Sequence, residues 1–525
     1  MRHPLFSPIQ SMGGLASITD SSSASTLSID PDLQTDLTWI RTMDGYSTVI
    51  EGVGEAVSTG FWPHLLAIGG LLLALFAIAR LMNDKRQPGN TIAWLLAIVL
   101  VPYVGVPLYL WLGGRKLKRL VASKNRMTLT LPSAPRASEN TLNPPTTKIM
   151  MANGAGAPVG GNHLTLLKSG EQAYAELVKL IRSAQHTIHI TTFILGREET
   201  GRAIITELAD RAQQGVKVRL LLDGLGSFRT SRRFCSELRD AGGEVVRFMP
   251  MAPLSTRHSA NLRNHRKIAI FDHHTAIVGG RNLAREYMGP SKDLQRWTDF
   301  GAIVRGPAVG LIAEIFFADW QHAANKSVED FRAEAPFICP PNEGMSDLHV
   351  IASGPDVAGD PLYEGLVSFI QEAESSVWII TPYFIPDEVL QRSLLVKARA
   401  GVDITLIVPA KSNHVIPDLA RRQYLRELQQ AGARILLYQP SMLHAKVVIT
   451  DDRLAIFGSA NFDLRSLFVN FEIGIAVYSP EQVAEIQAWA DELVRDSQSY
   501  IAGQNPRRWY NSLAEDLSRL LAPLL

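Results

Sequence analysis

One short pattern occurs twice in the chain and constrains its fold more than any other feature. A histidine, one residue, a lysine, four residues and an aspartate are followed in each copy by a small-residue turn and an asparagine. The interval from histidine to asparagine is 17 residues in both copies. The first copy supplies His265, Lys267, Asp272, Gly280 and Asn282, and the second supplies His444, Lys446, Asp451, Ser459 and Asn461. One copy alone is weak evidence, but two matched copies indicate a duplicated functional strand.

The alternation of residues within each copy predicts how the side chains point. Residues two apart on a strand share a face, so each histidine lies on the same face as its lysine. The apolar residues that follow, such as Ile268 and Val447, suit a buried strand. An imidazole beside an ammonium and amide donors suits a phosphate, because the cation binds the oxygens and the imidazole attacks phosphorus or protonates a leaving oxygen. Displacement at a phosphodiester needs both a nucleophile and an acid, so we expect the two copies to meet in one site.

The paired motifs resemble those of the phospholipase D superfamily over residues from about Leu164 to Tyr500. The segment from Thr91 to Gly113, with Pro102, Gly105 and Tyr109, is similar to the N-terminal membrane region of bacterial cardiolipin synthases. This resemblance implies an α/β fold of two duplicated phospholipase D-like domains with pseudo-two-fold symmetry. It also implies that one histidine forms a phosphohistidine while the other protonates the leaving alcohol. We assign His265 as the nucleophile and His444 as the general acid and base, with the reverse order as the alternative.

The resemblance assigns further roles to the matched positions. Four residues are implied to hold the phosphoryl oxygens, with backbone or hydroxyl contacts from two more: Lys267, Lys446, Asn282 and Asn461, then Gly280 and Ser459. Asp299 and Glu472 are implied to orient the histidines, and ordinary surface acids are the alternative. This scheme requires no metal or other cofactor, since two lysines supply the compensating charge.

Two features of the motifs have simpler interpretations. Asp272 and Asp451 belong to the family motif, but their odd spacing from the lysines places them on the other strand face. We therefore expect them to stabilise the turn rather than take part in the reaction. The pair His273 and His274 has no third ligand at a useful spacing, so these are interpreted as loop histidines rather than metal ligands.

The two halves of the chain also match outside these motifs. Residues 187–194 match 377–384, residues 212–222 match 398–408, and residues 240–248 match 430–438. Alternating helices and apolar strands predict α/β units with mixed or parallel sheets. We therefore predict one domain over residues 163–340 and a second over residues 341–500, placed so that the two histidine strands face one cleft.

Two apolar runs precede the repeated region, at residues 61–82 and 92–112. Each run has roughly the 20 residues that a helix needs to cross a bilayer, and aromatic residues stand near the ends of the second. A pair of buried core helices is the alternative interpretation. We predict a transmembrane helical hairpin within residues 61–113 of a multi-pass protein of the bacterial inner membrane. The basic residues after it favour a cytoplasmic catalytic part.

The remaining segments are less distinctive. Residues 1–60 are rich in Ser, Thr and Asp and predict a disordered extension. Residues 114–162 predict a basic segment followed by a linker. Residues 501–525 place apolar side chains at helical spacing and predict an amphipathic helix, which packs on the catalytic domain or lies on the membrane surface.

Composition narrows the function further. A net charge of +1 gives no overall attraction to nucleic acid, and two cysteines exclude a disulfide framework. With the resemblance, we expect a membrane phosphatidyltransferase whose partners are phosphatidylglycerol, cardiolipin and the bilayer. One phosphatidylglycerol would donate its phosphatidyl group to His265 and release glycerol, and a second would attack to give cardiolipin. The alternatives are a phospholipase D-type hydrolase or nuclease, a transferase with another acceptor, and a non-catalytic lipid-binding protein.

Overall fold

The computed structural model describes residues 64–65, 67–79, 81, 88–112, 129, 134–142, 144–250, 262–325, 339–502, 515–516 and 518. The chain forms two compact units, one of residues 1–83 and 87–106 and the other of residues 84–86 and 107–525. The predicted extension at residues 1–60 and most of the predicted C-terminal helix lie outside the described residues. Both copies of the repeated motif lie in the larger unit.

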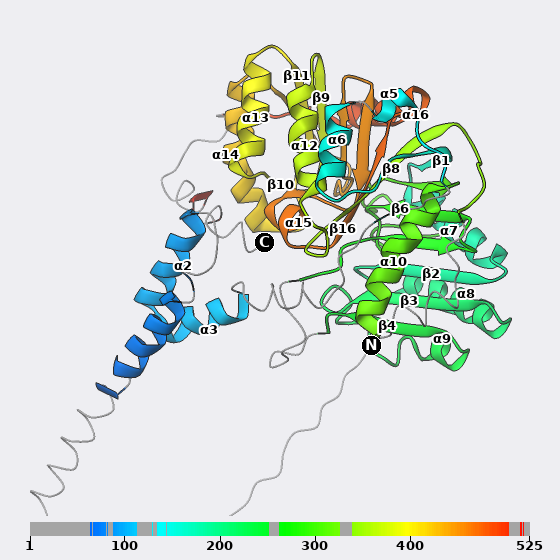
Figure 1. Cartoon of the computed structure of the whole chain (residues 1–525), viewed down its shortest axis with the longest axis horizontal. Coiled ribbons are helices and arrows are strands. Elements are labelled where there is room, and N and C mark those ends of the chain that lie inside the picture. The colour runs from blue at the N-terminus through cyan, green and yellow to red at the C-terminus, as the bar shows by residue number, and fades with distance from the viewer. Residues whose placement is uncertain are drawn as a thin grey trace, which may run out of the picture. The chain divides into compact units, whose positions relative to one another are not determined.

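Fifteen strands of the larger unit form one sheet, to which each half of the repeat contributes one side (Figure 1). From the centre outward, the first half contributes β1 (Val159–Leu167), β7 (Gly301–Arg305), β6 (Thr275–Gly279), β5 (Ile268–Phe271), β2 (Thr187–Thr192), β3 (Lys217–Asp223) and β4 (Glu244–Phe248). The second contributes β8 (Ser346–Ser353), β16 (Glu472–Val477), β14 (Leu454–Gly458), β13 (Val447–Thr450), β9 (Ser376–Ile380), β11 (Asp403–Pro409), β12 (Arg434–Tyr438) and the edge strand β17 (Ser497–Ser499). Up to β12 the two orders correspond strand by strand, and the antiparallel pair β1 and β8 joins them. The prediction of two duplicated α/β halves is confirmed.

The directions of the strands decide where the motifs lie. β2 pairs in parallel with β3 and antiparallel with β5, and β9 pairs in the same way with β11 and β13. The chain therefore enters β5 and β13 at the end of the sheet where the parallel strands of the same half finish. His265 and His444 immediately precede β5 and β13, so both stand at strand ends rather than in the middle of the sheet.

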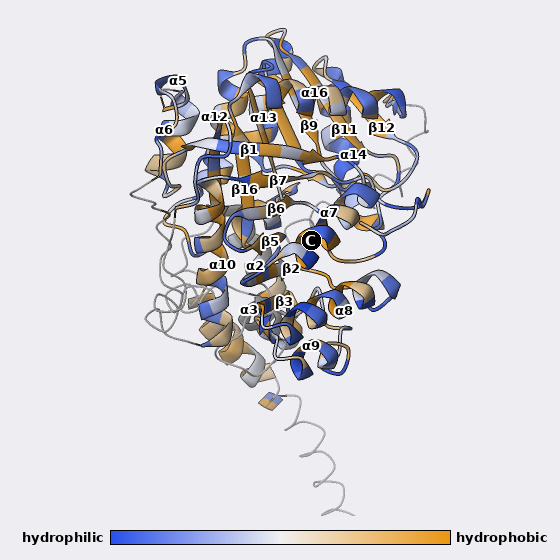
Figure 2. Cartoon of the chain, turned by 90° about the vertical axis from the view of Figure 1, so that its right-hand side faces the viewer, coloured by the Kyte–Doolittle hydropathy of each residue, from blue (hydrophilic) through white to orange (hydrophobic). Residues whose placement is uncertain are grey.

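Helices cover the sheet of each half. They are α7 (Gly170–Ser183), α8 (Glu199–Gln213), α9 (Ser236–Asp240) and α10 (Ala308–Ala324) in the first half, and α12 (Pro361–Glu372), α13 (Glu388–Arg399), α14 (Val415–Gln430), α15 (Leu464–Phe468) and α16 (Pro480–Arg495) in the second. Figure 1 shows α12, α13 and α14 side by side, and Figure 2 shows that the strands they accompany are mainly hydrophobic. Gly215 follows α8 with a φ of 90° and Gly401 follows α13 with a φ of 93°. This left-handed conformation favours glycine, and it ends two equivalent helices.

One prediction for the N-terminal part differs from the structure. The second apolar run is not one helix, because α2 (Pro88–Leu100) ends before Pro102, where α3 (Pro102–Leu112) begins. Proline lacks the N–H of the helix ladder and restricts the residue before it, which explains the break. Among the described residues, no helix is both long enough and apolar enough to cross a membrane.

Part of the predicted linker is regular structure. Within residues 114–162 the chain forms α5 (Glu139–Leu142) and α6 (Pro145–Ala152), and β1 begins at Val159. α6 packs against α12 of the second half, and its Thr146 hydroxyl donates to Glu372 at 2.5 Å. Proline at the first helical positions starts α6 in a segment whose Pro, Thr and Asn content otherwise resembles a loop.

Candidate active site

Two backbone contacts between the halves bring the histidines together. The His265 N–H donates to the Phe471 carbonyl at 2.9 Å, which ties the segment before β5 to the second half. The His444 N–H donates to the Thr298 carbonyl at 2.7 Å, which ties the segment before β13 to the first half. Both imidazoles line one cleft with a volume of about 410 Å³. The fold thus places both copies of the motif in a single site.

Each imidazole contacts a carboxylate from the opposite half. Nδ1 of His265 lies 2.9 Å from Oε1 of Glu472, and Nδ1 of His444 lies 2.6 Å from Oδ2 of Asp299. An ionised carboxylate only accepts hydrogen bonds, so each Nδ1 carries the proton. The Nε2 lone pair of each ring is then available for chemistry.

Burial favours the neutral form of both imidazoles. It lowers the pKa of His265, and it lowers the pKa of His444 to about 3, with the Lys446 ammonium adding to the effect. An anionic phosphodiester in the cleft opposes both causes and raises the pKa of each imidazole. Substrate binding therefore favours the protonated form that a general acid requires.

The lysines are desolvated and the acids are charged. Burial lowers the pKa of Lys446 to about 8 and that of Lys267 well below its ordinary value. Burial alone would raise the pKa of Asp299, but Lys446 and His444 outweigh it and lower the pKa. The pKa of Glu472 is lowered in the same way by His265 and Lys267. The site therefore holds two carboxylates and two desolvated lysine amines beside two neutral rings.

The lysines and asparagines provide contacts for a phosphate. Nζ of Lys267 donates to the His265 carbonyl at 2.6 Å, and Nζ of Lys446 lies 2.7 Å from Nδ1 and 3.1 Å from Nε2 of His444. Nδ2 of Asn282 and Oδ1 of Asn461 are buried without a hydrogen-bond partner among the described residues. Both asparagines line the cleft. Buried amides with unused capacity are groups that a polar ligand would satisfy.

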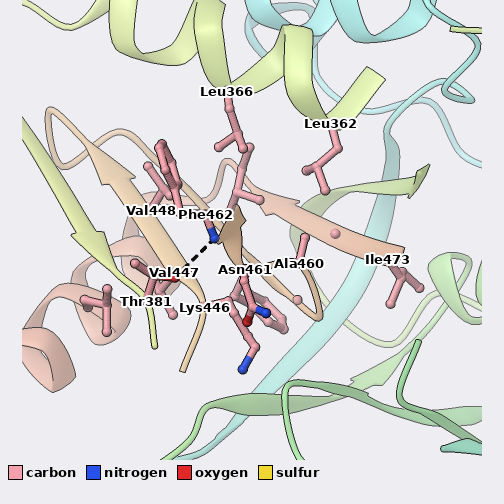
Figure 3. A pocket seen from close by; sticks show the side chains of 15 residues that line it. Leu362, Leu366, Thr381, Lys446, Val447, Val448, Ala460, Asn461, Phe462 and Ile473 are labelled. Atoms are coloured by element: carbon pink, nitrogen blue, oxygen red, sulfur yellow. Dashed lines mark hydrogen bonds between the residues drawn. The ribbon is translucent and has the colours of Figure 1, made fainter. Parts of the chain in front are cut away.

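A small apolar cavity lies behind this cluster in the second half. Figure 3 shows Leu362 and Leu366 of α12 on one side of it, whereas Lys446 and Asn461 point away from them. The Phe462 N–H donates to the Thr381 hydroxyl at 3.2 Å and fixes the turn that carries Asn461. The lysine and the asparagine are thus held on a packed apolar base, with their polar ends on the other side.

Gly280 and Ser459 do not contact the cleft, in contrast to their predicted role. Their backbone N–H groups are used inside the sheet, and the Ser459 hydroxyl donates to Glu472. A Cβ on Gly280 would lie 2.2 Å from Oδ1 of Asp299. Both residues therefore accommodate the carboxylate that contacts a histidine, one by a hydrogen bond and the other by leaving space.

Asp272 and Asp451 stand away from the reacting groups. Asp272 accepts from the N–H groups of Gln185, His186 and Thr187 at 2.7 to 2.8 Å. Asp451 makes the equivalent contacts with the N–H groups of residues 374–376. Each aspartate therefore ties the end of its motif strand to the start of the neighbouring strand. His273 follows with its ring stacked on Phe317.

Sequence reasoning gave no role to Arg266, the middle residue of the first motif. Its guanidinium is fully buried, lies 2.6 Å from Oδ1 of Asp319 and 3.4 Å from Oδ1 of Asp356, and donates to the Glu472 carbonyl at 3.0 Å. The equivalent residue of the second half is Ala445. The only indication of this role in the sequence is the position of Arg266 between the histidine and the lysine, which points its side chain away from the face that those two residues share.

Several other residues of the cleft were also not predicted. Aromatic rings surround one histidine, with Tyr287 at 5.1 Å and Trp297 at 5.4 Å between ring centroids from His444. Charged and polar residues of the cleft include Arg263, Asp463, Arg465, Ser466 and Asn470. Arg465 and Ser466 belong to α15 and Asp463 is its N-cap, whereas the other residues come from loops, where side-chain periodicity gives no indication of a shared site.

Comparisons with known proteins support the duplicated architecture. The family model described as cardiolipin synthase, phospholipase D-like domain, matches residues 177–320 and 366–494. A second model, described as phospholipase D-nuclease N-terminal, matches residues 72–114. The crystal structure of phosphatidylserine synthase from Haemophilus influenzae covers 78% of this chain and 100% of its own, with a TM-score of 0.56 and 15% identity. That likeness shows a shared fold.

Sequence relatives span nearly the whole chain. The cardiolipin synthase of Geobacillus kaustophilus is 32% identical over 501 residues, which is 91% of this chain and 98% of the relative. Cardiolipin synthase 1 of Bacillus anthracis is 33% identical over 466 residues, which is 84% of this chain and 90% of the relative. With both halves matched by the family model, the chain belongs to the cardiolipin synthase family of the phospholipase D superfamily.

Proposed function

We propose that this protein is a cardiolipin synthase that transfers a phosphatidyl group between two phosphatidylglycerol molecules and releases glycerol. The observation that carries the proposal is the pair of histidines in one cleft, each held by a carboxylate of the opposite half. Full-length relatives named cardiolipin synthase support the choice of substrate and acceptor.

The first step forms a covalent intermediate. Nε2 of His265 attacks the phosphorus of the first phosphatidylglycerol, and the bond from phosphorus to the glycerol oxygen breaks. His444 gives its proton to that oxygen, so glycerol leaves as a neutral alcohol. Glu472 at 2.9 Å from Nδ1 stabilises the positive charge that develops on the His265 ring.

The second step reverses the roles of the groups. His444 removes the proton from a free hydroxyl of the second phosphatidylglycerol, whose oxygen attacks phosphorus. The bond from phosphorus to Nε2 of His265 breaks, and cardiolipin forms. Negative charge accumulates on the phosphoryl oxygens during both steps. Four residues bind these oxygens and stabilise that charge: Lys267, Lys446, Asn282 and Asn461.

The N-terminal part anchors the protein in the bacterial inner membrane, with the catalytic part on the cytoplasmic side. The support is the match of residues 72–114 to the N-terminal family model and the exposure of many large apolar residues in that part. Leu72, Phe76 and Leu100 are examples. Protease digestion of sealed inner-membrane vesicles of known orientation tests the placement of the catalytic part.

Product analysis tests the reaction. The purified full-length chain is incubated with phosphatidylglycerol, and the expected products are cardiolipin and glycerol in equal amounts. Phosphatidic acid in place of cardiolipin would identify a hydrolase, because water would then be the acceptor. The His265→Ala variant should bind phosphatidylglycerol without turnover, whereas unchanged turnover would refute the assignment of this histidine.

A further inference from the structure

Two loops border the cleft from equivalent positions of the two halves. Residues 224–235 follow β3, and residues 410–416 follow β11 into the first turn of α14. Because β3 and β11 finish at the end of the sheet where the histidines stand, both loops leave the sheet beside the cleft. Leu225 lines the cleft from the first loop, and Asn413 and His414 line it from the second.

Both loops expose large apolar side chains. Phe228 is 60% exposed in the first loop, and Val415 and Ile416 are 72% and 39% exposed in the second. Single exposed apolar residues are common on soluble proteins and need no explanation. Here they occupy matched loops on both sides of one cleft, which gives them a shared position relative to the substrate.

The same loops carry positive charge. Arg229, Arg232 and Arg233 are exposed in the first loop, and Lys411 is exposed in the second. Neither loop contains an aspartate or a glutamate. The Arg229 guanidinium lies 5.4 Å from the centre of the Phe228 ring, so the first loop exposes a cation and an apolar side chain next to each other. Apolar tips with neighbouring cations match the interface of a bilayer that contains anionic phospholipid.

The size of the cleft explains why such a surface is needed. Its volume of about 410 Å³ is within the range of roughly 300–1,000 Å³ for pockets that hold one small molecule. Two phospholipids with four acyl chains do not fit in that space, whereas their headgroups do. The acyl chains therefore stay in the bilayer while the headgroups react, which requires the cleft to open directly onto the lipid surface.

We propose that residues 224–235 and 410–416 form a docking rim that seats the open side of the cleft on a bilayer containing anionic phospholipid. This inference rests on the proposed function, because it assumes that the substrates are membrane lipids. The apolar side chains enter the interface, and the arginines and Lys411 bind lipid phosphates. The rim acts in addition to the N-terminal anchor, which holds the chain near the membrane without orienting the cleft.

Two rim variants of the full-length chain test the proposal. One combines Phe228→Ser with Val415→Ser, and the other combines Arg229→Gln, Arg232→Gln and Arg233→Gln. The control is Met345→Ser. Met345 is also exposed, at 95%, but it lies before the first residue of β8, whereas Glu472 of the site pairs with the last residue of that strand. Cardiolipin formation is measured on two substrates: vesicles of long-chain phosphatidylglycerol with phosphatidylcholine, and dihexanoyl phosphatidylglycerol below its micelle concentration.

The expected result separates docking from catalysis. Each rim variant should lose about tenfold or more in kcat/KM on vesicles and stay within about twofold of the unmodified chain on the dispersed lipid. Met345→Ser should match the unmodified chain on both. If the rim variants lose kcat/KM equally on both substrates, the proposal is overturned. It is also overturned if they lose none on the vesicles, which contain no other protein, and that outcome would point to a protein partner. If the unmodified chain makes no cardiolipin from either lipid, the proposed function fails instead.

Discussion

His265 of the first half and Glu472 of the second half form a hydrogen bond, with Nδ1 of the ring 2.9 Å from the carboxylate. His444 and Asp299 repeat the relationship in the opposite direction at 2.6 Å. Neither half therefore holds a complete catalytic group, because each imidazole takes its orientation and its tautomer from the other half. The duplicated chain has one site rather than two half-sites that work separately.

Loss of charge at Glu472 should impair the chemical step more than substrate binding. In Glu472→Gln the amide still contacts Nδ1 of His265, but it no longer stabilises the positive ring. We expect kcat to fall by about 10²- to 10⁴-fold, as for the aspartate of a serine protease triad, with a small change in KM. Steady-state assays of cardiolipin formation measure both. A loss confined to KM would contradict an orienting role.

The nucleophile can be identified by trapping the intermediate. A phosphatidyl ester with a p-nitrophenol leaving group needs little acid assistance, so His444→Ala should still become labelled by it. His265→Ala should not, because it lacks the attacking nitrogen. A phosphohistidine hydrolyses in acid. The reaction is therefore quenched with alkali before the labelled protein is measured. Labelling of His265→Ala alone would reverse the two roles.

Spacing and periodicity predicted which residues of each copy lie together, but not how the halves exchange partners. His265 and Glu472 are 207 residues apart, and their contact depends on bridges such as Asn264 to Phe471. No local pattern encodes a pairing over that distance. The acids were expected only because the sequence resembles a family that uses them.

The sequence around a residue also did not predict its role where one polar group could serve two partners. Ser459 sits in the expected turn, yet its hydroxyl is used by the buried Glu472, which leaves it unavailable to a phosphate. Similarly, an apolar run predicts helix but not continuity, and Pro102 divides the second run into two helices.

Gly280 should be sensitive to the smallest addition. In Gly280→Ala the new Cβ would lie 2.2 Å from Oδ1 of Asp299, so the carboxylate must move away from His444. We expect cardiolipin formation to fall by about 10²-fold or more, since a small misplacement of a catalytic group has effects of that size. Ser459→Ala is the matched variant of the second half. It removes one hydrogen bond without a clash, so it should lose less activity than Gly280→Ala, and the opposite order would contradict the steric argument.

Lys446 sets an alkaline limit on the reaction. Burial lowers its pKa to about 8 from an ordinary value of 10.5. Only the ammonium form attracts a phosphodiester, so the decline of kcat/KM with pH should become steeper as the pH rises through about 8. In Lys446→Arg the cation persists to far higher pH, and the limit should move upward in whatever activity remains. An unchanged alkaline limit in this variant would assign it to another group.

Arg266 should contribute to stability as well as to the site. Arg266→Ala removes a buried guanidinium that contacts Asp319 and Asp356, and it releases the carbonyl of Glu472. Breaking a buried ion pair costs about 3–5 kcal/mol, and we expect the free energy of unfolding to fall by that amount in urea denaturation followed by tryptophan fluorescence. Arg182→Ala, which removes an exposed ion pair with Glu207, should leave the transition nearly unchanged. If the two variants unfold alike, Arg266 does not stabilise the junction of the halves. If Arg266→Ala is less stable but retains full activity, the backbone contact to Glu472 does not position the acid.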